Sequence, residues 1–217
     1  MDTGVGRLLD GLKELGIADN TYVVFTSDNG GHGSIPGRDT TRLPANHPLT
    51  GHKHQLYEGG IRVPFVVKGP GVPAGDVCNV PVAGYDLLPT FYDLAGGRTP
   101  LPPEVDGVSL KPLWHNPRLA EIDRPHTALI FHRPGRKVSA IRQGEDKLLL
   151  RWDKNGGVAS RELYRFSPDP REAGRDRAAE DPARSDNLQS ALLAYLKSVN
   201  AETPQTVPRK NRKVDED

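Results

Sequence analysis

Apolar residues recur at helical spacing from Asp2 to Leu15, with charged residues between them, so that the apolar side chains share one stripe. Gly16 follows as a C-terminal stop, and the pattern predicts a helix that begins almost at the first residue. After a short turn, residues 22–27 form a continuous β-rich run, which predicts a strand buried on both faces, as in a parallel sheet. A helix, a short loop and a buried strand make up half of an α/β unit.

The next segment, residues 28–57, is rich in Gly, Pro, His and Asn and shows no period. A loop of this length inside a compact domain is usually functional. A second strand is predicted over 61–67, where Pro64 indicates an edge strand or a bulge. Asp86 is a suitable N-cap for a helix that extends through Leu94.

From residue 127 the pattern changes to short alternating runs separated by turns. Strands are predicted over 128–131, 138–142, 147–152 and 162–166, and consecutive short strands of this kind favour an antiparallel sheet. A last amphipathic helix carries its leucines on one stripe: Leu188, Leu192, Leu193 and Leu196. The fold class is therefore α/β, with a first part over 1–125, a small sheet with a packed helix over 126–200, and a charged, solvated tail over 201–217.

Composition narrows the class of partners. The 217 residues contain 29 Lys and Arg against 28 Asp and Glu, and the net charge of +1 provides no broad cationic surface for nucleic acid. The longest apolar runs are too short to span a bilayer, and the N-terminus shows no export signal. We therefore expect neither a nucleic acid nor a membrane as a partner.

Candidate chemistry lies directly after the first predicted strand, in Ser27-Asp28-Asn29-Gly30-Gly31. Ligands in open α/β sheets bind outside the carboxyl ends of the strands, and this segment places a carboxylate and an amide oxygen there. Such hard oxygen donors suit Ca²⁺ or Mg²⁺, whereas zinc favours imidazole or thiolate ligands. Taken alone, however, Asp-Asn-Gly is also an ordinary turn sequence.

The segment from Tyr22 to Gly31 resembles the calcium-binding segment of the sulfatase family, and further blocks of that family follow in the same order. Lys53 together with Tyr57-Glu58-Gly59-Gly60-Ile61-Arg62-Val63-Pro64 resembles the family's lysine and its Tyr-Glu-Gly-Gly-x-Arg-x-Pro signature. The later blocks are Asp86-Leu87-Leu88-Pro89-Thr90, Asp106-Gly107-Val108-Ser109-Leu110, Ala140-Ile141-Arg142 and Glu162-Leu163-Tyr164. The resemblance implies the C-terminal portion of an alkaline-phosphatase-like α/β domain, followed by a small antiparallel sheet with a packed helix.

The resemblance also implies an activity, that of a sulfuric ester hydrolase of the arylsulfatase type. Asp28 and Asn29 would bind one Ca²⁺, and Lys53 would contact the sulfate of the substrate, a sulfated carbohydrate or an aryl sulfate. A divalent ion and an ammonium group would stabilise the negative charge that develops as sulfate is lost. His52 and His54 replace the small residues that commonly flank this lysine, and they are further candidates for substrate contact.

Other residues of the same region have structural interpretations. Glu58 and Arg62 of the signature are expected to brace the loop and the strand rather than to touch substrate. The histidines between residues 32 and 54 suggest a zinc site as an alternative, but their separations fit no compact ligand motif. We therefore favour solvated loop histidines.

The nucleophile is expected outside this chain. Members of the family attack sulfur with a formylglycine made from a Cys/Ser-x-Pro-x-Arg motif, which lies upstream beside the remaining calcium ligands. Cys78 does not qualify, because Pro81 stands one position too late. Ser34-Ile35-Pro36-Gly37-Arg38 matches the motif letter for letter, but it follows the calcium segment and opens no apolar helix. We interpret this match as a coincidence and assign no catalytic residue within the chain.

Two alternatives to a sulfatase stay open. One is a phosphodiesterase or phosphotransferase of the same superfamily; members with two zinc ions usually have histidine where Asn29 stands, which favours the sulfatase. The other is an inactive fragment that acts as a binding or assembly piece. Met1 resembles an internal methionine of the family, so we expect a missing N-terminal half as a partner and poor solubility without it. The full-length protein is expected to be periplasmic or secreted, as family members commonly are.

Overall fold

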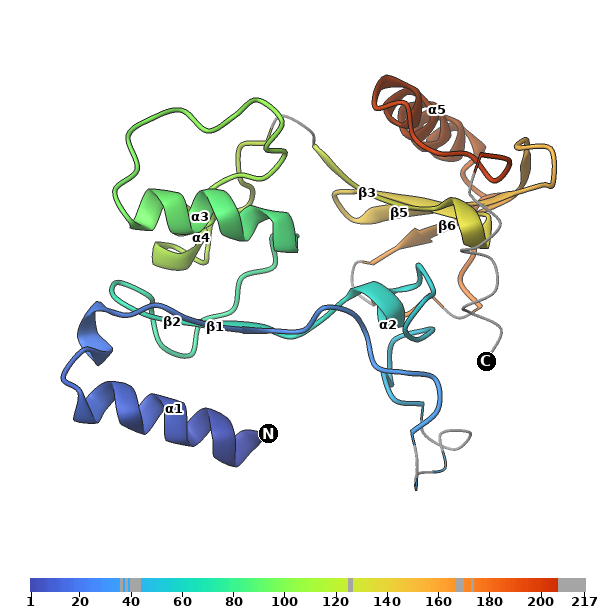
Figure 1. Cartoon of the computed structure of the whole chain (residues 1–217). Coiled ribbons are helices and arrows are strands. Elements are labelled where there is room, and N and C mark those ends of the chain that lie inside the picture. Colours follow the sequence, from blue (N-terminus) through green and yellow to red (C-terminus); the bar gives the residue numbers. More distant parts are fainter. Residues whose placement is uncertain are drawn as a thin grey trace. The chain divides into compact units, whose positions relative to one another are not determined.

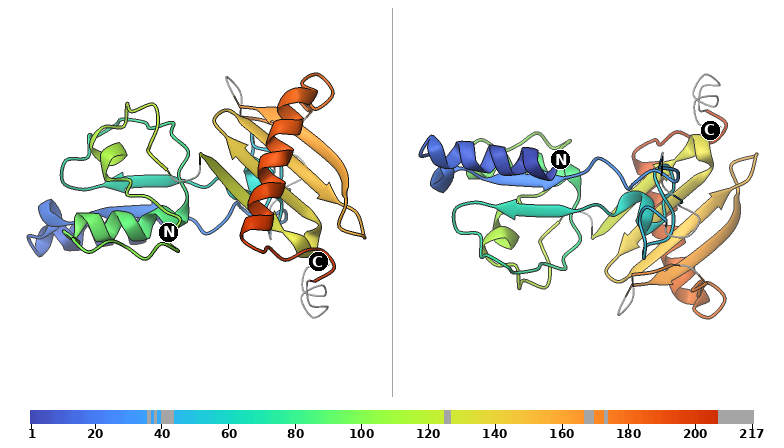
Figure 2. Two further views of the ribbon diagram at one scale, coloured as in Figure 1. Left: turned by 90° about the horizontal axis from the view of Figure 1, so that it is seen from above. Right: turned by 90° about the horizontal axis from the view of Figure 1, so that it is seen from below.

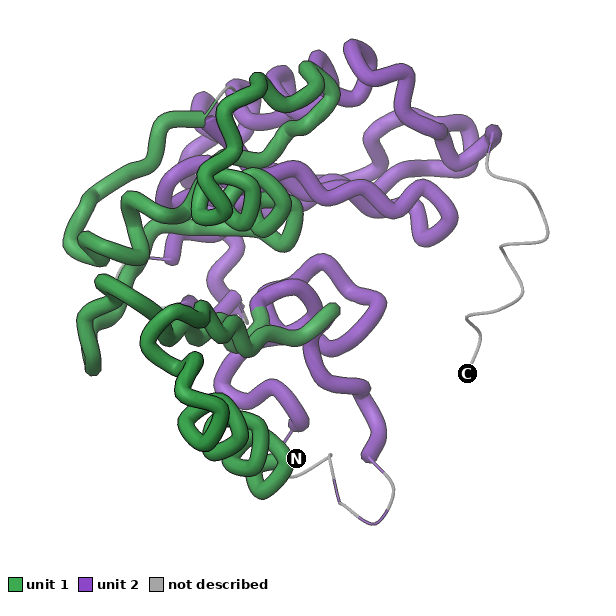
Figure 3. Tube along the Cα trace, turned by 60° about the vertical axis from the view of Figure 1, so that its left-hand side comes forward, with its two compact units in different colours: residues 1–28, 63–125 green, residues 29–62, 126–217 purple. Residues whose placement is uncertain are grey.

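A computed structural model describes residues 1–35, 37, 39, 44–124, 127–166, 170–172 and 174–206. The chain forms two compact units: unit 1 contains residues 1–28 and 63–125, and unit 2 contains residues 29–62 and 126–217 (Figure 3). Residues 29–62 thus group with the C-terminal sheet, whereas the sequence analysis placed them in the first part, 1–125. The division into domains at residues 125 and 200 stays a prediction. Each unit is described by itself.

Unit 1 combines helices with a two-stranded sheet (Figure 1). Its elements are α1 (Asp2–Glu14), the 3₁₀ turn η1 (Ala18–Asn20), β1 (Val23–Thr26), β2 (Phe65–Lys68), the 3₁₀ turn η2 (Gly84–Asp86), α3 (Leu87–Leu94) and α4 (Lys111–His115). The helices predicted from Asp2 and up to Leu94 are confirmed. The core of the unit consists of Leu110, Leu113 and Trp114, against which side chains of β1, β2 and α3 pack.

The predicted parallel pairing of the first strand is wrong for the described residues. β1 pairs with β2 in antiparallel register, so that Val23 lies opposite Lys68. The strand is not buried on both faces either, because its last two residues are exposed. An apolar run favours a strand but does not set the direction of its neighbour. β2 begins after Pro64 rather than at residue 61, since residues 58–61 close a helical turn.

Asp86 occupies the N-cap position of α3 as predicted, but its side chain does not cap the helix. The fully buried carboxylate instead accepts hydrogen bonds from the Arg124 guanidinium at 2.9 and 2.7 Å. The backbone N–H groups of Ala83 and Val108 donate to the same carboxylate at 2.8 and 3.1 Å. Asp86 therefore ties three segments of unit 1 together.

Unit 2 is built on a four-stranded antiparallel sheet in the order β3-β4-β5-β6, which confirms the predicted sheet. The elements are α2 (Glu58–Ile61), β3 (Ala128–Arg133), the 3₁₀ turn η3 (Pro134–Arg136), β4 (Val138–Gln143), β5 (Asp146–Trp152), β6 (Val158–Arg165) and α5 (Pro182–Ser198). The last helix is confirmed with its leucine stripe, since Leu188, Leu192 and Leu196 are buried.

Both faces of this sheet are covered, as the two views in Figure 2 show. On one face, α5 packs against alternate residues of β4 and β5, namely Ile141, Leu148 and Leu150. On the other face, Leu56 from the loop before α2 packs against Val138, Ala140 and Leu149. Alternation with period 2 thus assigns each strand residue to the helix face or to the loop face.

Several predictions fall on residues that the structure does not describe. The tail was predicted over 201–217, and residues 207–217 lie outside the described residues. The coincidental motif at Ser34 includes Pro36 and Arg38, which lie outside them too. Within the described part of the chain, no helix is both long and apolar enough to cross a bilayer.

Candidate functional site

The Asp-Asn segment lies where the sequence placed it, just after β1. Asp28 is exposed and Asn29 is half-buried. The Ser27 hydroxyl donates a hydrogen bond to Oδ1 of Asp28 at 3.4 Å. The amide nitrogen of Asn29 donates to the Gly30 carbonyl at 3.0 Å, which fixes the orientation of the amide group.

Gly30 anchors this segment beneath the Tyr-Glu-Gly-Gly turn. Its N–H donates to the Gly60 carbonyl at 3.0 Å. A Cβ atom at this position would overlap the Gly59 carbonyl group, at 2.7 Å from the carbonyl carbon, and would lie 2.9 Å from Cα of Gly60. Contacts this close between backbones require glycine. Gly30, which completes the ordinary turn sequence Asp-Asn-Gly, therefore serves the close approach of two loops.

A clamp formed by Asn46 holds the next residue, Gly31. The Asn46 amide oxygen accepts from the Gly31 N–H at 2.7 Å, and the amide nitrogen donates to the carbonyls of Gly31 at 3.0 Å and Gly51 at 3.2 Å. Sequence reasoning missed Asn46, because an Asn in a long Gly- and Pro-rich loop is an ordinary turn residue.

Lys53 is connected to the same loops through its backbone. Its N–H donates to the Gly31 carbonyl at 2.9 Å, two residues beyond Asn29. Lys53 as a whole residue is half-buried. Asn29, Gly30, Gly31, Asn46, Lys53, Gly59 and Gly60 are called the loop cluster below.

The two histidines beside Lys53 have different surroundings. Nδ1 of His52 donates to the Lys53 carbonyl at 2.8 Å, and the His52 ring lies against Gly33. His54 has a left-handed backbone with φ of 77°, and its carbonyl accepts a hydrogen bond from the Arg133 guanidinium. The rings of His54 and His32 meet edge to face with centroids 6.4 Å apart.

The structure also places the residues that the sequence analysis considered and set aside. Cys78 is an exposed thiol in unit 1. Ser34 is exposed, and its hydroxyl lies 3.3 Å from Nδ1 of His32. Among the described residues, no group of three or more His, Cys, Asp or Glu could hold a metal ion.

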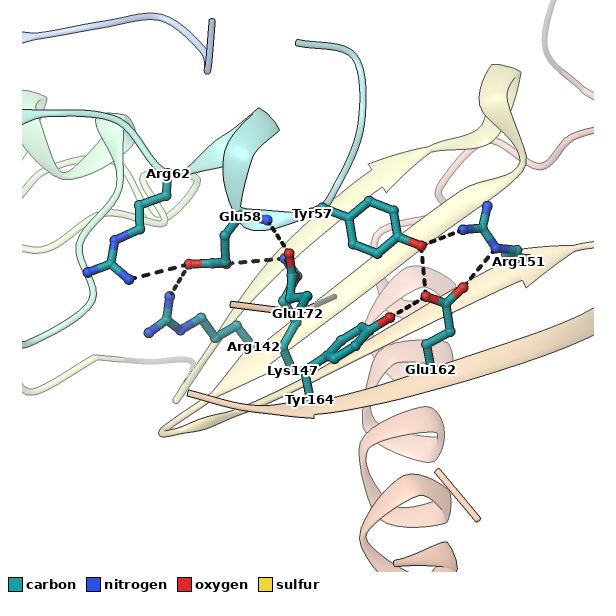
Figure 4. A network of polar contacts seen from close by, with 9 residues as sticks. All are labelled: Tyr57, Glu58, Arg62, Arg142, Lys147, Arg151, Glu162, Tyr164 and Glu172. Atoms are coloured by element: carbon teal, nitrogen blue, oxygen red, sulfur yellow. Dashed lines mark hydrogen bonds and ion pairs between the residues drawn. The ribbon is translucent and has the colours of Figure 1, made fainter. Parts of the chain in front are cut away.

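Glu58 has the bracing role that was predicted for it. Its buried carboxylate forms ion pairs with Lys147 at 3.1 Å and Arg142 at 3.0 Å, both from the sheet, and with Arg62 at 3.8 Å (Figure 4). No individual role was predicted from the sequence for Lys147 or for its second partner, Glu172. The available signal was a lysine that continues directly into the apolar run of β5.

Known proteins resemble this chain in sequence and in fold. A family model described as Sulfatase matches residues 1–97. A sulfatase of Formosa agariphila is 32% identical over 231 residues, which cover 94% of this chain and 39% of that protein. An extracellular sulfatase SULF-1 homolog of Drosophila melanogaster is 35% identical over 158 residues, which cover 71% of this chain and 13% of that protein.

Solved structures share the fold. Ps i-CgsB in complex with k-i-k-neocarrahexaose superimposes with a TM-score of 0.74 at 27% identity, covering 97% of this chain and 47% of that chain. A protein in complex with its substrate D-glucosamine-2-N,6-O-disulfate superimposes with a TM-score of 0.71 at 25% identity, covering 95% of this chain and 40% of that chain. The chain spans less than half the length of each of these relatives and structures. The matches agree with the order of the motifs from Asp28 to Arg62, and the chain belongs to the sulfatase family.

Proposed function

We propose that this chain is part of a sulfuric ester hydrolase and that its loop cluster provides part of a calcium and sulfate site. The observation that carries the proposal is the hydrogen bond from the Lys53 N–H to the Gly31 carbonyl, at 2.9 Å. It holds the segment with the proposed calcium ligand Asn29 beside the segment with the proposed sulfate-binding lysine. Both segments belong to unit 2.

The donor set at the end of β1 fits a hard cation. Asp28 offers carboxylate oxygens and Asn29 an amide oxygen, which are the ligand types that Ca²⁺ takes. The hydrogen bond from the Asn29 amide nitrogen to Gly30 orients the amide group. When bound, the ion would supply positive charge against the sulfate oxygens. Because Ca²⁺ takes six to eight ligands, we propose that the others come from the rest of a longer protein.

Lys53 has the role of an electrophilic clamp in this proposal. Its ammonium group would bind a nonbridging sulfate oxygen and stabilise the negative charge that grows as the ester bond breaks. His52 and His54 would line the approach to this group. The hydrogen bond of His52 to the Lys53 carbonyl fixes one ring, so His52 would present a defined edge to the substrate.

The proposed substrate class is a sulfate ester of a carbohydrate or a phenol. Two of the solved structures that share this fold are complexes with k-i-k-neocarrahexaose and with D-glucosamine-2-N,6-O-disulfate, which supports a sulfated sugar. We propose that a formylglycine nucleophile comes from an upstream segment. A second candidate function, that of an inactive binding piece, is favoured by the presence of only two proposed calcium ligands.

Turnover by an assembly of this chain with an upstream segment that carries a Cys/Ser-x-Pro-x-Arg motif tests the proposal. We expect hydrolysis of 4-nitrophenyl sulfate that requires Ca²⁺ and exceeds hydrolysis of bis(4-nitrophenyl) phosphate. Lys53→Met should lower kcat/KM for the sulfate by about a hundredfold or more, as expected for loss of one oxyanion-stabilising group. Lys154→Met, at an exposed lysine of the β5–β6 turn, is the matched control and should stay within twofold. A preference for the phosphodiester, or full activity of Lys53→Met, would refute the proposal.

A further inference from the structure

A buried cluster of charges lies between the loop cluster and the sheet of unit 2. Lys147 of β5 is fully buried, and its ammonium group contacts Glu58 at 3.1 Å and Glu172 at 2.8 Å (Figure 4). Both carboxylates are also buried, with 1% of each residue exposed. One buried cation thus joins two buried carboxylates from distant parts of the chain.

Glu172 holds the backbone of the Tyr-Glu-Gly-Gly turn as well as the lysine. Its Oε2 accepts from the Glu58 N–H at 2.7 Å, while its Oε1 accepts from Lys147. Burial raises the pKa of Glu172, although Lys147 opposes this shift. Arg142 donates to the other oxygen of Glu58 at 3.0 Å and stacks over the Phe166 ring at 4.7 Å. The first residue of α2 is therefore fixed through both its main chain and its side chain.

The residue before Glu58 is fixed to the same face of the sheet. The Tyr57 hydroxyl donates to Glu162 at 2.8 Å and accepts from Arg151 at 2.8 Å (Figure 4). The strand residues of both networks, which are Arg142, Lys147, Arg151, Glu162 and Tyr164, follow the period-2 alternation of the loop face. Two consecutive residues of the turn are thus held by polar contacts to three strands.

These contacts continue into the loop cluster through the backbone. The Gly59 N–H, next to Glu58, donates to the Thr50 carbonyl at 2.7 Å. The Gly60 carbonyl accepts from Gly30 at 3.0 Å. A displacement of Glu58 therefore moves the glycines on which the Asn29 and Lys53 segments rest.

Energetics indicate that this network fixes geometry. A buried ion pair is often no more stabilising than apolar side chains of the same size, whereas loss of one partner leaves an uncompensated charge. Apolar packing already joins the loop to the sheet through Leu56. Hydrogen bonds are directional, so those from one ammonium group to two carboxylates define where the turn lies on the sheet. Apolar contacts alone would allow the turn to shift along the sheet.

We propose that Lys147, with Glu172 as its second carboxylate partner, is a positioning residue for the loop cluster. It sets the place of the Glu58–Gly60 turn and, through it, of Asn29 and Lys53. Its consequence for catalysis rests on the function proposed above for Lys53. Its structural consequence does not depend on that function.

Hydrogen exchange of the 217-residue chain, followed by NMR, separates positioning from general stability. In Lys147→Met we expect exchange at the Gly30 and Lys53 amides to accelerate about a hundredfold relative to the Leu192 amide in α5. Arg184→Met is the matched control, because Arg184 forms an ion pair with Asp146, the neighbour of Lys147, at 2.8 Å. It should leave the ratio of loop to helix exchange within threefold of wild type.

Glu172→Gln is the second variant if Lys147→Met does not fold, since it retains the pair of Lys147 with Glu58. Equal acceleration at Leu192 and at the loop amides would overturn the proposal, as would unchanged exchange at Gly30. Loss of the fold in both variants would overturn it too, because the network would then be a requirement for folding. In an assembly that hydrolyses 4-nitrophenyl sulfate, Lys147→Met should lower kcat/KM tenfold or more and Arg184→Met less than twofold. If wild type shows no turnover, the proposed function fails, and the exchange experiment still decides the positioning role.

Discussion

Gly30→Ala should destabilise unit 2 even though it adds only one methyl group. The added Cβ would overlap the Gly59 carbonyl group and lie 2.7 Å from its carbon, whereas ordinary contact begins at 3.4 Å. The carbonyl oxygen of Gly59 would lie closer still than the carbon, so the two loops must separate to admit the methyl group. The neighbouring atoms are backbone, which cannot rotate away as a flexible side chain can.

The magnitude follows from two contributions. Separation of the loops breaks the hydrogen bond from Gly30 to Gly60, which contributes about 1 kcal/mol net. Overpacking of one methyl group into a closely packed site costs roughly 1–3 kcal/mol. We therefore expect the free energy of unfolding of unit 2 to fall by about 2–4 kcal/mol.

Urea unfolding with tryptophan fluorescence can measure this effect for each unit. The chain has two tryptophans, with Trp114 in unit 1 and Trp152 in unit 2. In a Trp114→Phe background, Trp152 alone reports the unfolding of unit 2. The control is Gly84→Ala in a Trp152→Phe background, where Trp114 alone reports the unfolding of unit 1, because nothing lies within 4 Å of a Cβ at that position. The control should change the unfolding free energy by less than about 0.5 kcal/mol. A Gly30→Ala variant as stable as wild type would refute the steric argument.

Three further predictions concern a buried charge, the pH dependence of stability and the exposed apolar surface. Asp86→Asn should lower the free energy of unfolding of unit 1 by about 3–5 kcal/mol, because it leaves the Arg124 guanidinium uncompensated. Asp93→Asn removes a half-exposed pair with Lys111 and should lower it by less than about 1 kcal/mol. Equal losses for the two variants in urea unfolding would contradict this account. Burial alone would raise the pKa of Glu162, but hydrogen bonds from Tyr164, Tyr57 and Arg151 outweigh it and lower the pKa. A lowered folded-state pKa contributes stability that is present above the unfolded value near 4.3 and is lost as pH falls through the folded value. The difference in urea midpoint between wild type and Glu162→Gln should therefore shrink from pH 7 to pH 3, and a constant difference would count against the assignment. Large apolar side chains of α1, β2 and α3 are exposed, so the chain should bind the dye ANS in native buffer, and the Leu8→Glu variant should bind less. Dye fluorescence no higher than that of a folded control protein would contradict this prediction.

The parts of the fold that the sequence predicted well are those with local signals. The four strands of unit 2 are consecutive, so each pairs with the next along the chain and a tight connection sets the register. The stripe of leucines in α5 likewise repeats within one helix and predicted which face is buried. In contrast, the direction of the partner of β1 depends on a strand about forty residues away, which no local pattern encodes.

The loop cluster could be predicted only in part. The motifs identified Asp28, Asn29 and Lys53 by their order, but the contact between their segments is made by backbone groups and by Asn46. Backbone hydrogen bonds leave no signature except glycine, and glycine also marks any turn. The sequence therefore located the segments of the candidate site but not the contacts that bring them together.

Lys147 shows what a closer reading of the same pattern could have found. The run Lys147-Leu148-Leu149-Leu150 follows the period of neither a half-exposed strand nor a helix, and such a run indicates a strand covered on both faces. In a strand of this kind a lysine has no route to solvent, so its charge requires carboxylates from outside the strand. Leu148 and Leu150 face α5 and Leu149 faces the loops, which places Lys147 on the loop face by alternation. Carboxylates that cover the loop face are then its expected partners, and Glu58 of the Tyr-Glu-Gly-Gly turn is one of the two that the structure shows. A charge inside a doubly covered strand thus indicates where the loops of the candidate site are attached to the C-terminal sheet.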